Sequence, residues 1–217
     1  MHLAIGPFNI HVTTMNEMPA KLEARAKRKS AKREEKKSQI AASAIEALKE
    51  LGYANTSLRD IAEKSDLSLG MLHYYFEDRT DLIIYCVDVY KRQFVADIMA
   101  ALEKAEGRES VIERFSDALA ASITDDAMTH RLWYDMRTQA LFDATFRPIV
   151  DEIEAMLIDI VRIAMVKAGH EAPENVEISY ALVDGIFRYL MQHQIGEAPR
   201  SIDEIAEIFR SLLAKTL

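Results

Sequence analysis

Residues Thr56–Phe76 read TSLRDIAEKSDLSLGMLHYYF, and this stretch has the pattern of two short helices joined by a turn. Leu58, Ile61 and Ala62 fall on one helical face at the i, i+3, i+4 spacing. The spacing stops at Ser65-Asp66, where aspartate tolerates the left-handed backbone that a tight turn requires. The stretch therefore predicts a helix-turn-helix.

Capping residues mark both helix starts. Thr56 or Ser57 is suited to cap the first helix, with Asp60 placed to complete the cap, and Ser68 is suited to cap the second. The second helix is short and carries aromatic side chains that can form hydrogen bonds. A helix of this kind can enter a DNA major groove and contact base edges and phosphates.

The stretch resembles the DNA-binding domain of the TetR-type (tetracycline-repressor-like) family of bacterial regulators. The matching positions are Ile40, Ala41, Ala44, Leu48, Gly52, Tyr53, Thr56, Ser57, Ile61, Ala62, Ser68, Gly70, Leu72, Tyr75, Phe76 and Leu82. Asp66 replaces the usual turn glycine, Leu69 a frequent lysine, and His73 a common tyrosine. The resemblance implies a ligand-responsive repressor that binds operator DNA as a homodimer, with activation as the alternative polarity.

Twelve residues are predicted to bind double-stranded operator DNA. They are Lys36, Lys37, Thr56, Ser57, Ser68, Leu69, Gly70, Met71, His73, Tyr74, Tyr75 and Arg79. Gly70 is expected to allow close approach to the DNA, whereas Leu72 and Phe76 are expected to face the core of the domain.

The remainder of the chain indicates an all-α fold of about nine helices. No proline lies between Ala20 and Arg147, and the stretch is rich in good helix formers. We expect a flexible basic leader over residues 1–31, the helix-turn-helix domain over 32–79, and an effector-binding and dimerisation domain over 80–217. Met1, Met15 and Met18 are alternative start residues. The expected helices run from 31–37 to 51, over the two described above, and over 78–104, 110–123, 125–141, 148–169, 174–195 and 201–215.

Charge is distributed unevenly along the chain. The net charge is −8, yet nine basic and only three acidic residues lie between positions 21 and 37. A basic segment next to a helix-turn-helix is what a local phosphate-binding footprint requires. We therefore expect this segment to contact DNA, although a solvated charged tail is the alternative.

The last two expected helices carry apolar residues on more than one side, which requires burial on more than one side. They could be central core helices, or they could pack both on their own body and on a second copy. Because helix-turn-helix proteins commonly pair to read two half-sites, we favour a homodimer. The candidate interface residues are Phe187, Leu190, Phe209 and Leu213.

Aromatic residues cluster between positions 130 and 146, together with an arginine. A cavity lined by aromatics and a few polar groups is typical of small-molecule sites, so we expect an effector pocket here, with ordinary helical core as the alternative. The candidate pocket residues are Tyr85, Phe94, Trp133, Arg137, Phe142 and Phe146.

No catalytic motif or close metal-ligand spacing is found, so no catalytic residue, metal or cofactor is predicted. Cys86 is interpreted as a small core residue, and a metal held by distant residues such as His130 and His193 remains an alternative. A single cysteine and the lack of a long uninterrupted apolar run favour a cytoplasmic protein without a membrane span. The rival functions are a helical ligand-binding protein or metal-dependent enzyme that retains the helix-turn-helix as a relic, and a pure interaction protein.

Overall fold

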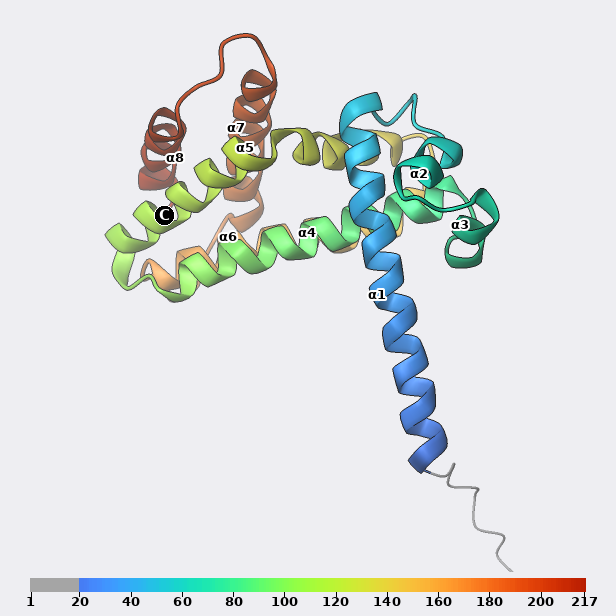
Figure 1. The fold of residues 1–217 in the computed structure, drawn as a ribbon. Coiled ribbons are helices and arrows are strands. Elements are labelled where there is room, and N and C mark those ends of the chain that lie inside the picture. The colour runs from blue at the N-terminus through green and yellow to red at the C-terminus, as the bar shows by residue number, and fades with distance from the viewer. Residues whose placement is uncertain (1–19) are drawn as a thin grey trace, which may run out of the picture. The chain divides into compact units, whose positions relative to one another are not determined.

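The computed structural model describes residues 20–217, and the described chain is helical with no strand (Figure 1). The elements are α1 (Ala20–Leu51), α2 (Leu58–Lys64), α3 (Leu69–Tyr75), α4 (Arg79–Glu103), α5 (Gly107–Gln139), a 3₁₀ turn η1 (Ala144–Phe146), α6 (Arg147–Lys167), α7 (Val176–Ile195) and α8 (Ile202–Thr216). The predicted leader up to residue 19, with the alternative starts Met1, Met15 and Met18, lies outside the described residues. The predicted all-α class is confirmed.

Helix α1 begins at Ala20, well before the predicted start within residues 31–37. Its early part contains alanine, lysine, arginine and glutamate, which favour helix, and neither proline nor glycine from Ala20 onward. The chain divides after Lys36 into two compact units. In the second unit α1 ends at Leu51 and is followed by Gly52, whose φ of +78° is the left-handed conformation expected of a glycine cap.

The helix-turn-helix forms as its sequence predicts. Ser57 and Asp60 make a reciprocal capping box at the start of α2, and the Ser68 side chain accepts a hydrogen bond from the amide of Met71 in α3. Asp66 adopts a left-handed conformation with φ of 54°, so aspartate provides the turn where glycine is usual. The Asp78 side chain caps α4 through the Asp81 amide.

A small hydrophobic core holds this domain together. It is formed by buried side chains of α1, α2, α3 and the first turns of α4: Ile40, Ala41, Ala44, Ala47, Ile61, Leu72, Phe76, Leu82 and Cys86. Leu72 and Phe76 therefore face the core as predicted. Burial raises the pKa of the Cys86 thiol to about 12, in keeping with the interpretation of this cysteine as a core residue.

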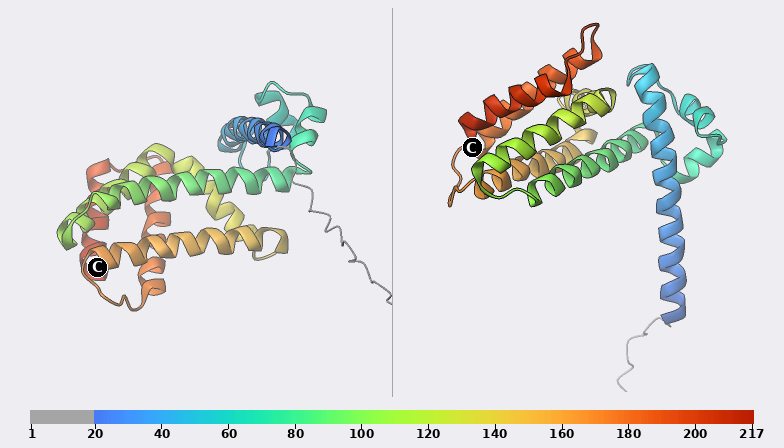
Figure 2. Two further views of the ribbon diagram at one scale, coloured as in Figure 1. Left: turned by 90° about the horizontal axis from the view of Figure 1, so that it is seen from below. Right: turned by 60° about the vertical axis from the view of Figure 1, so that its left-hand side comes forward.

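The larger core lies among α4, α5, α6, α7 and α8. Helix α5 packs against the other four helices, while α4 contacts α6, α6 contacts α7, and α7 contacts α8 (Figure 2). Helix α5 replaces the two helices predicted over 110–123 and 125–141. Its hydrogen bonding runs through the junction, but Asp126 has non-helical backbone angles and kinks the helix where the break was expected. The described chain thus has eight α-helices rather than nine.

Helix α4 belongs to both cores. Leu82 and Cys86 pack in the DNA-binding domain, whereas Phe94, Ile98 and Leu102 pack in the larger body. A second connection is made by Tyr53, whose ring meets that of Phe146 edge-on at a centroid distance of 6.5 Å. In residues 20–217, no helix is long and apolar enough to cross a membrane.

Candidate DNA-binding interface and effector pocket

The exposed face of α3 carries most of the residues predicted to contact DNA. Leu69, Met71 and Tyr74 are exposed, as are Gly70 and His73, while Tyr75 is half-buried against the small core. The Tyr74 and Tyr75 rings meet edge-on at 5.0 Å. Because Leu72 anchors the opposite side of the helix in the core, α3 presents a fixed, accessible face of mixed apolar and polar groups.

Four other residues that are predicted to contact DNA form hydrogen bonds within the domain. Thr56 is buried and donates its hydroxyl hydrogen bond to the Gly52 carbonyl at 2.7 Å, so its assignment to DNA contact is corrected to a structural one. The Ser57 and Ser68 hydroxyls accept the helix-capping hydrogen bonds of α2 and α3. Both serines are nevertheless exposed at helix starts, where backbone amides can receive phosphate oxygens.

The Arg79 guanidinium also forms hydrogen bonds inside the domain. It donates to the carbonyls of Thr56 and Tyr53 and lies 4.5 Å from the centre of the Tyr53 ring. These bonds tie the start of α4 to the loop before α2. We therefore assign Arg79 a positioning role rather than the predicted DNA contact.

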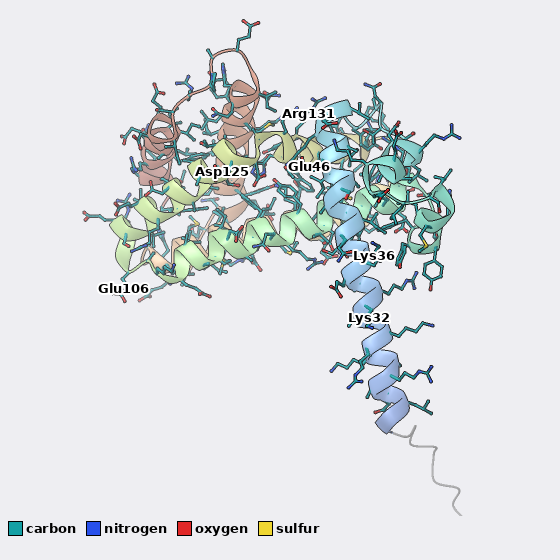
Figure 3. The ribbon with its side chains drawn as sticks, in the orientation of Figure 1. Lys32, Lys36, Glu46, Glu106, Asp125 and Arg131 are labelled. Atoms are coloured by element: carbon teal, nitrogen blue, oxygen red, sulfur yellow. The ribbon has the colours of Figure 1, made fainter. Side chains whose placement is uncertain are left out.

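Basic side chains lie along α1. Those between positions 22 and 33 are exposed, and Figure 3 shows them radiating from the helix, with Lys32 and Lys36 labelled. In the second unit, the Lys37 ammonium lies 4.8 Å from the Phe76 ring centre and 4.6 Å from that of Tyr85. Lys37 therefore covers the edge of the small core while remaining half-buried.

A cavity opens between four helices of the body. Its wall is mostly branched aliphatic and aromatic, with four polar side chains. The lining comes from α4 (Lys91, Phe94, Ile98), α5 (Phe115, Leu119, Tyr134), α6 (Leu157, Ile160, Val161) and α7 (Tyr180, Val183, Asp184, Phe187).

Most of the polar groups at this cavity belong to one network. Asp184 accepts a hydrogen bond from the Tyr134 hydroxyl at 3.0 Å and pairs with Arg137 at 2.6 Å. The other side of Arg137 pairs with Glu154 at 2.5 Å, and the Tyr180 hydroxyl donates to Glu154 at 3.4 Å. Burial, followed by the Asp184 charge, raises the pKa of both tyrosines, so each remains a neutral donor.

Behind the cavity wall, His130 is fully buried between Tyr90 and Ser122. Its Nε2 lies 3.2 Å from the Ser122 carbonyl, which only accepts, so Nε2 carries the proton and Nδ1 accepts from the Tyr90 hydroxyl. Burial and the nearby Lys91 charge hold the pKa of His130 well below its ordinary value. Both ring nitrogens are thus engaged, which removes His130 from the metal-ligand alternative.

The predicted pocket residues lie in four different places. Phe94 lines the cavity, and Arg137 joins its polar network. Trp133 and Phe146 are fully buried in the larger core rather than in the cavity wall. Tyr85 packs beside the small core, and Phe142 is 83% exposed in the turn after α5. Neither residue lines the cavity, so both pocket predictions are wrong.

Lys91, Tyr134, Tyr180 and Asp184 line the cavity but are not among the residues predicted from the sequence. A signal was available for two of them. Lys91 falls within the buried stripe of α4, four residues after Val87 and three before Phe94, and Asp184 falls four residues after Tyr180 and three before Phe187. A charged residue in phase with an apolar stripe indicates a group that faces the interior.

The predicted dimer residues are buried within the protomer. Phe187, Leu190, Phe209 and Leu213 are all at most 5% exposed, so assigning them to an intersubunit surface is corrected. They form the inner faces of α7 and α8, and Phe187 also lines the cavity. A different stripe of α7 is exposed and apolar: Ile178, Leu182 and Tyr189, with Gly185 between them.

Among residues 20–217, no three His, Cys, Asp or Glu side chains gather to form a metal site. His193, the other histidine considered for such a site, packs edge-on against Tyr189 at 4.5 Å. The described chain therefore combines an exposed face of α3 with a helical body that contains a cavity, and α4 contributes to both parts.

Comparison with known proteins agrees with this arrangement. Residues 40–86 match the model of the bacterial regulatory proteins of the tetR family. The HTH-type transcriptional regulator PksA of Bacillus subtilis is 23% identical over 164 residues, covering 73% of this chain and 80% of PksA. BetI of Burkholderia thailandensis, also an HTH-type transcriptional regulator, is 23% identical over 120 residues, covering 53% of this chain and 60% of BetI.

Solved structures share the fold. A bacterial regulatory protein in the tetR family from Rhodococcus RHA1 superposes with a TM-score of 0.66 at 19% identity, covering 83% of this chain and 95% of that one. The matched residues contain α2, α3, the end of α1 and the start of α4, which are the elements of the small core. The capped helix-turn-helix is therefore similar to the DNA-binding domain of the tetR family of bacterial regulatory proteins over residues 40–86, and the chain as a whole shares the fold of solved members of that family.

Proposed function

We propose that the protein is a ligand-responsive repressor that binds operator DNA as a homodimer and releases it when a small molecule fills the cavity. The observation that carries the proposal is the double role of α4. Its first turns belong to the core behind the recognition helix, and its middle lines the cavity through Lys91, Phe94 and Ile98. A ligand that displaces the middle of α4 therefore also acts on the position of α3.

The direction of the response follows from differential binding. An effector shifts the equilibrium only if it binds the conformer with low operator affinity more tightly than the operator-bound one. Filling the cavity between α4 and the facing helices favours conformers in which α4 stands further from α6 and α7. The two recognition helices of a dimer would then no longer match the half-site spacing, which is about one DNA turn or ~34 Å.

The direct test is binding to the DNA immediately upstream of the protein's own gene, measured by fluorescence anisotropy against a scrambled duplex of equal length. Specific binding is expected to exceed binding to the scrambled duplex by roughly 10³-fold or more. Equal affinity for both duplexes at several salt concentrations would count against a regulator of that promoter. Turnover of a small molecule without any DNA preference would instead favour the enzyme alternative.

Gly70 offers a sharp test of how α3 meets DNA. A Cβ built at Gly70 meets no atom within 4 Å, so alanine fits the folded protein and should raise its stability by up to about 1 kcal/mol through helix propensity. If the backbone of α3 approaches a DNA groove closely, the same methyl group should weaken operator binding. We therefore expect Gly70→Ala to melt at a higher temperature and bind operator less tightly. Unchanged affinity would show that α3 does not approach DNA at this residue.

The basic part of α1 is expected to contribute affinity without sequence preference. Residues 22–31 are exposed, so deleting residues 1–31 is expected to change the free energy of unfolding little. Affinity for operator and scrambled DNA should fall together, and the log–log salt slope should flatten by roughly 0.9 per lost phosphate contact. Equal slopes for the truncated and full-length chains would mean that this segment is only solvated.

A further inference from the structure

Lys91 is a cationic side chain in the cavity wall that lacks an anionic partner. It is 2% exposed, and it is among the residues that line the space between α4, α5, α6 and α7. The contacts of Nζ within residues 20–217 are aromatic: the ring centres of Phe94, Tyr90 and Trp133 lie at 4.6, 5.2 and 5.3 Å. No carboxylate of the described chain lies within ion-pair distance of it.

The carboxylates nearest to this region are already engaged. Asp184 has one oxygen on the Tyr134 hydroxyl and the other on Arg137, and Glu154 takes the second side of Arg137 together with Tyr180. Turning Asp184 toward Lys91 would break two of these bonds. The network around Arg137 is therefore closed, and the Lys91 ammonium remains the unpaired donor that faces the cavity.

An ammonium in this position is costly. Ring faces attract a cation, but they accept no conventional hydrogen bond, and a buried charge without a partner is unfavourable. Burial lowers the pKa of Lys91 to about 7, with Asp184 acting in the opposite direction. The side chain is consequently close to half-protonated near neutral pH, and an anion in the cavity would favour the charged form.

We infer that the cavity binds an apolar monocarboxylic acid, with its carboxylate on the Lys91 ammonium and its hydrocarbon or aryl body between Phe115, Leu157 and Val161. The inference deepens the proposed function by assigning the chemical class of the effector. A single unpaired cation matches a single negative charge. A dianion would additionally meet the nearby carboxylates of Asp184 and Glu154 without a second free cation. A cationic ligand would have to stand beside Lys91 and compete with Arg137 for Asp184.

The first experiment compares three probes with the same chain and different head groups: decanoate, decanol and decylamine. Isothermal titration calorimetry on the full-length protein, below the aggregation limit of each probe, should give the order decanoate above decanol above decylamine. Equal binding of decanoate and decanol would overturn the inference, because the cavity would then select only an apolar body. Preference for decylamine would also overturn it, since Asp184 would be the anchor.

The second experiment removes the ammonium while keeping the length of the side chain. Lys91→Met should weaken decanoate at least roughly 30-fold, the usual consequence of deleting one member of a buried charge pair, and leave decanol nearly unchanged. Lys104→Met is the matched control, because Lys104 is the exposed residue that caps the end of α4. Equal loss in both variants, or loss of both probes in Lys91→Met, would show that the anion does not depend on Lys91.

A pH series on the unaltered chain tests the same contact without a mutation. Decanoate should bind best below the pKa of free Lys91 and lose affinity as pH rises above about 7, approaching tenfold per pH unit, because binding then requires a proton to be taken up. The other titratable or charged groups that face this region are Tyr90 of α4, Asp126, His130, Tyr134 and Arg137 of α5, Glu154 of α6, and Tyr180 and Asp184 of α7. A slope that persists in Lys91→Met would assign the titration to one of these and reject the inference.

Operator binding separates this inference from the proposed function. Decanoate should weaken operator affinity of the unaltered protein, and Lys91→Met should bind operator normally but no longer respond. A protein that binds operator specifically yet binds none of the three probes would contradict the ligand class and leave the repressor proposal standing. A protein that binds decanoate at Lys91 but no promoter DNA would contradict the repressor proposal instead.

Discussion

Phe76→Ala is expected to unfold the DNA-binding domain, at a cost of about 3–5 kcal/mol, and to abolish operator binding. Phe76 is 1% exposed and fills the small core between α1 and α4, with its ring 5.5 Å from that of Tyr85. Phe76 is the one aromatic side chain among the fully buried residues of that core, which otherwise contains three alanines, four larger aliphatic residues and Cys86, so its removal leaves the largest space. The loss is therefore expected at the upper end of core substitutions.

Structure should be lost only in the DNA-binding domain, because the larger core is formed by other residues. Hydrogen exchange should show faster exchange of amides in α2 and α3, while α6, α7 and α8 keep their protection. Phe142→Ala is the matched control, since Phe142 is 83% exposed and its removal should change the free energy of unfolding by at most about 0.5 kcal/mol. A Phe76→Ala protein with normal protection in α2 and α3 would contradict the core assignment.

The DNA-binding domain could be predicted from sequence because its signals are local. The capping box of Ser57 and Asp60, the cap at Ser68 and the left-handed turn at Asp66 each depend on residues three or four positions apart. The packing of the helical body is harder to predict from the sequence. Helix α7 is apolar on most of its circumference, so periodicity alone could not separate the inner face of Phe187 from the outer face of Leu182.

The cavity could not be located for a related reason. Its lining comes from four successive helices and extends from position 91 to position 187, and the aromatic residues between positions 130 and 146 differ in burial. Trp133 packs inward, whereas Phe142 lies in the turn that follows α5 and is exposed. The sequence predicts too short an α1 because a dense run of positive charge is typical of a flexible leader, although the same residues favour helix.

The exposed apolar stripe of α7 is a candidate surface for pairing two protomers. Ile178, Leu182 and Tyr189 are 60%, 48% and 49% exposed, and they follow one another at the four- and seven-residue spacing of a single helical face. Gly185 lies within the same stripe, and a Cβ there would meet no atom within 4 Å, so a second helix can approach closely. We propose that this face, rather than the buried residues Phe187 and Phe209, pairs the protomers.

Leu182→Glu is expected to convert the dimer into monomers and to weaken operator binding by roughly 10²–10⁴-fold, the contribution of holding two half-site contacts together. The glutamate would stand in an apolar interface without a partner in the dimer but remain solvated in the monomer, so the fold should persist. Sedimentation velocity and anisotropy on the same sample measure both effects. Leu141→Glu is the matched control, because Leu141 is 72% exposed in the turn after α5 and outside the stripe, and it should remain dimeric. A dimeric Leu182→Glu protein with full operator affinity would place the interface on another face, and a monomeric one with full affinity would show that a single helix-turn-helix suffices.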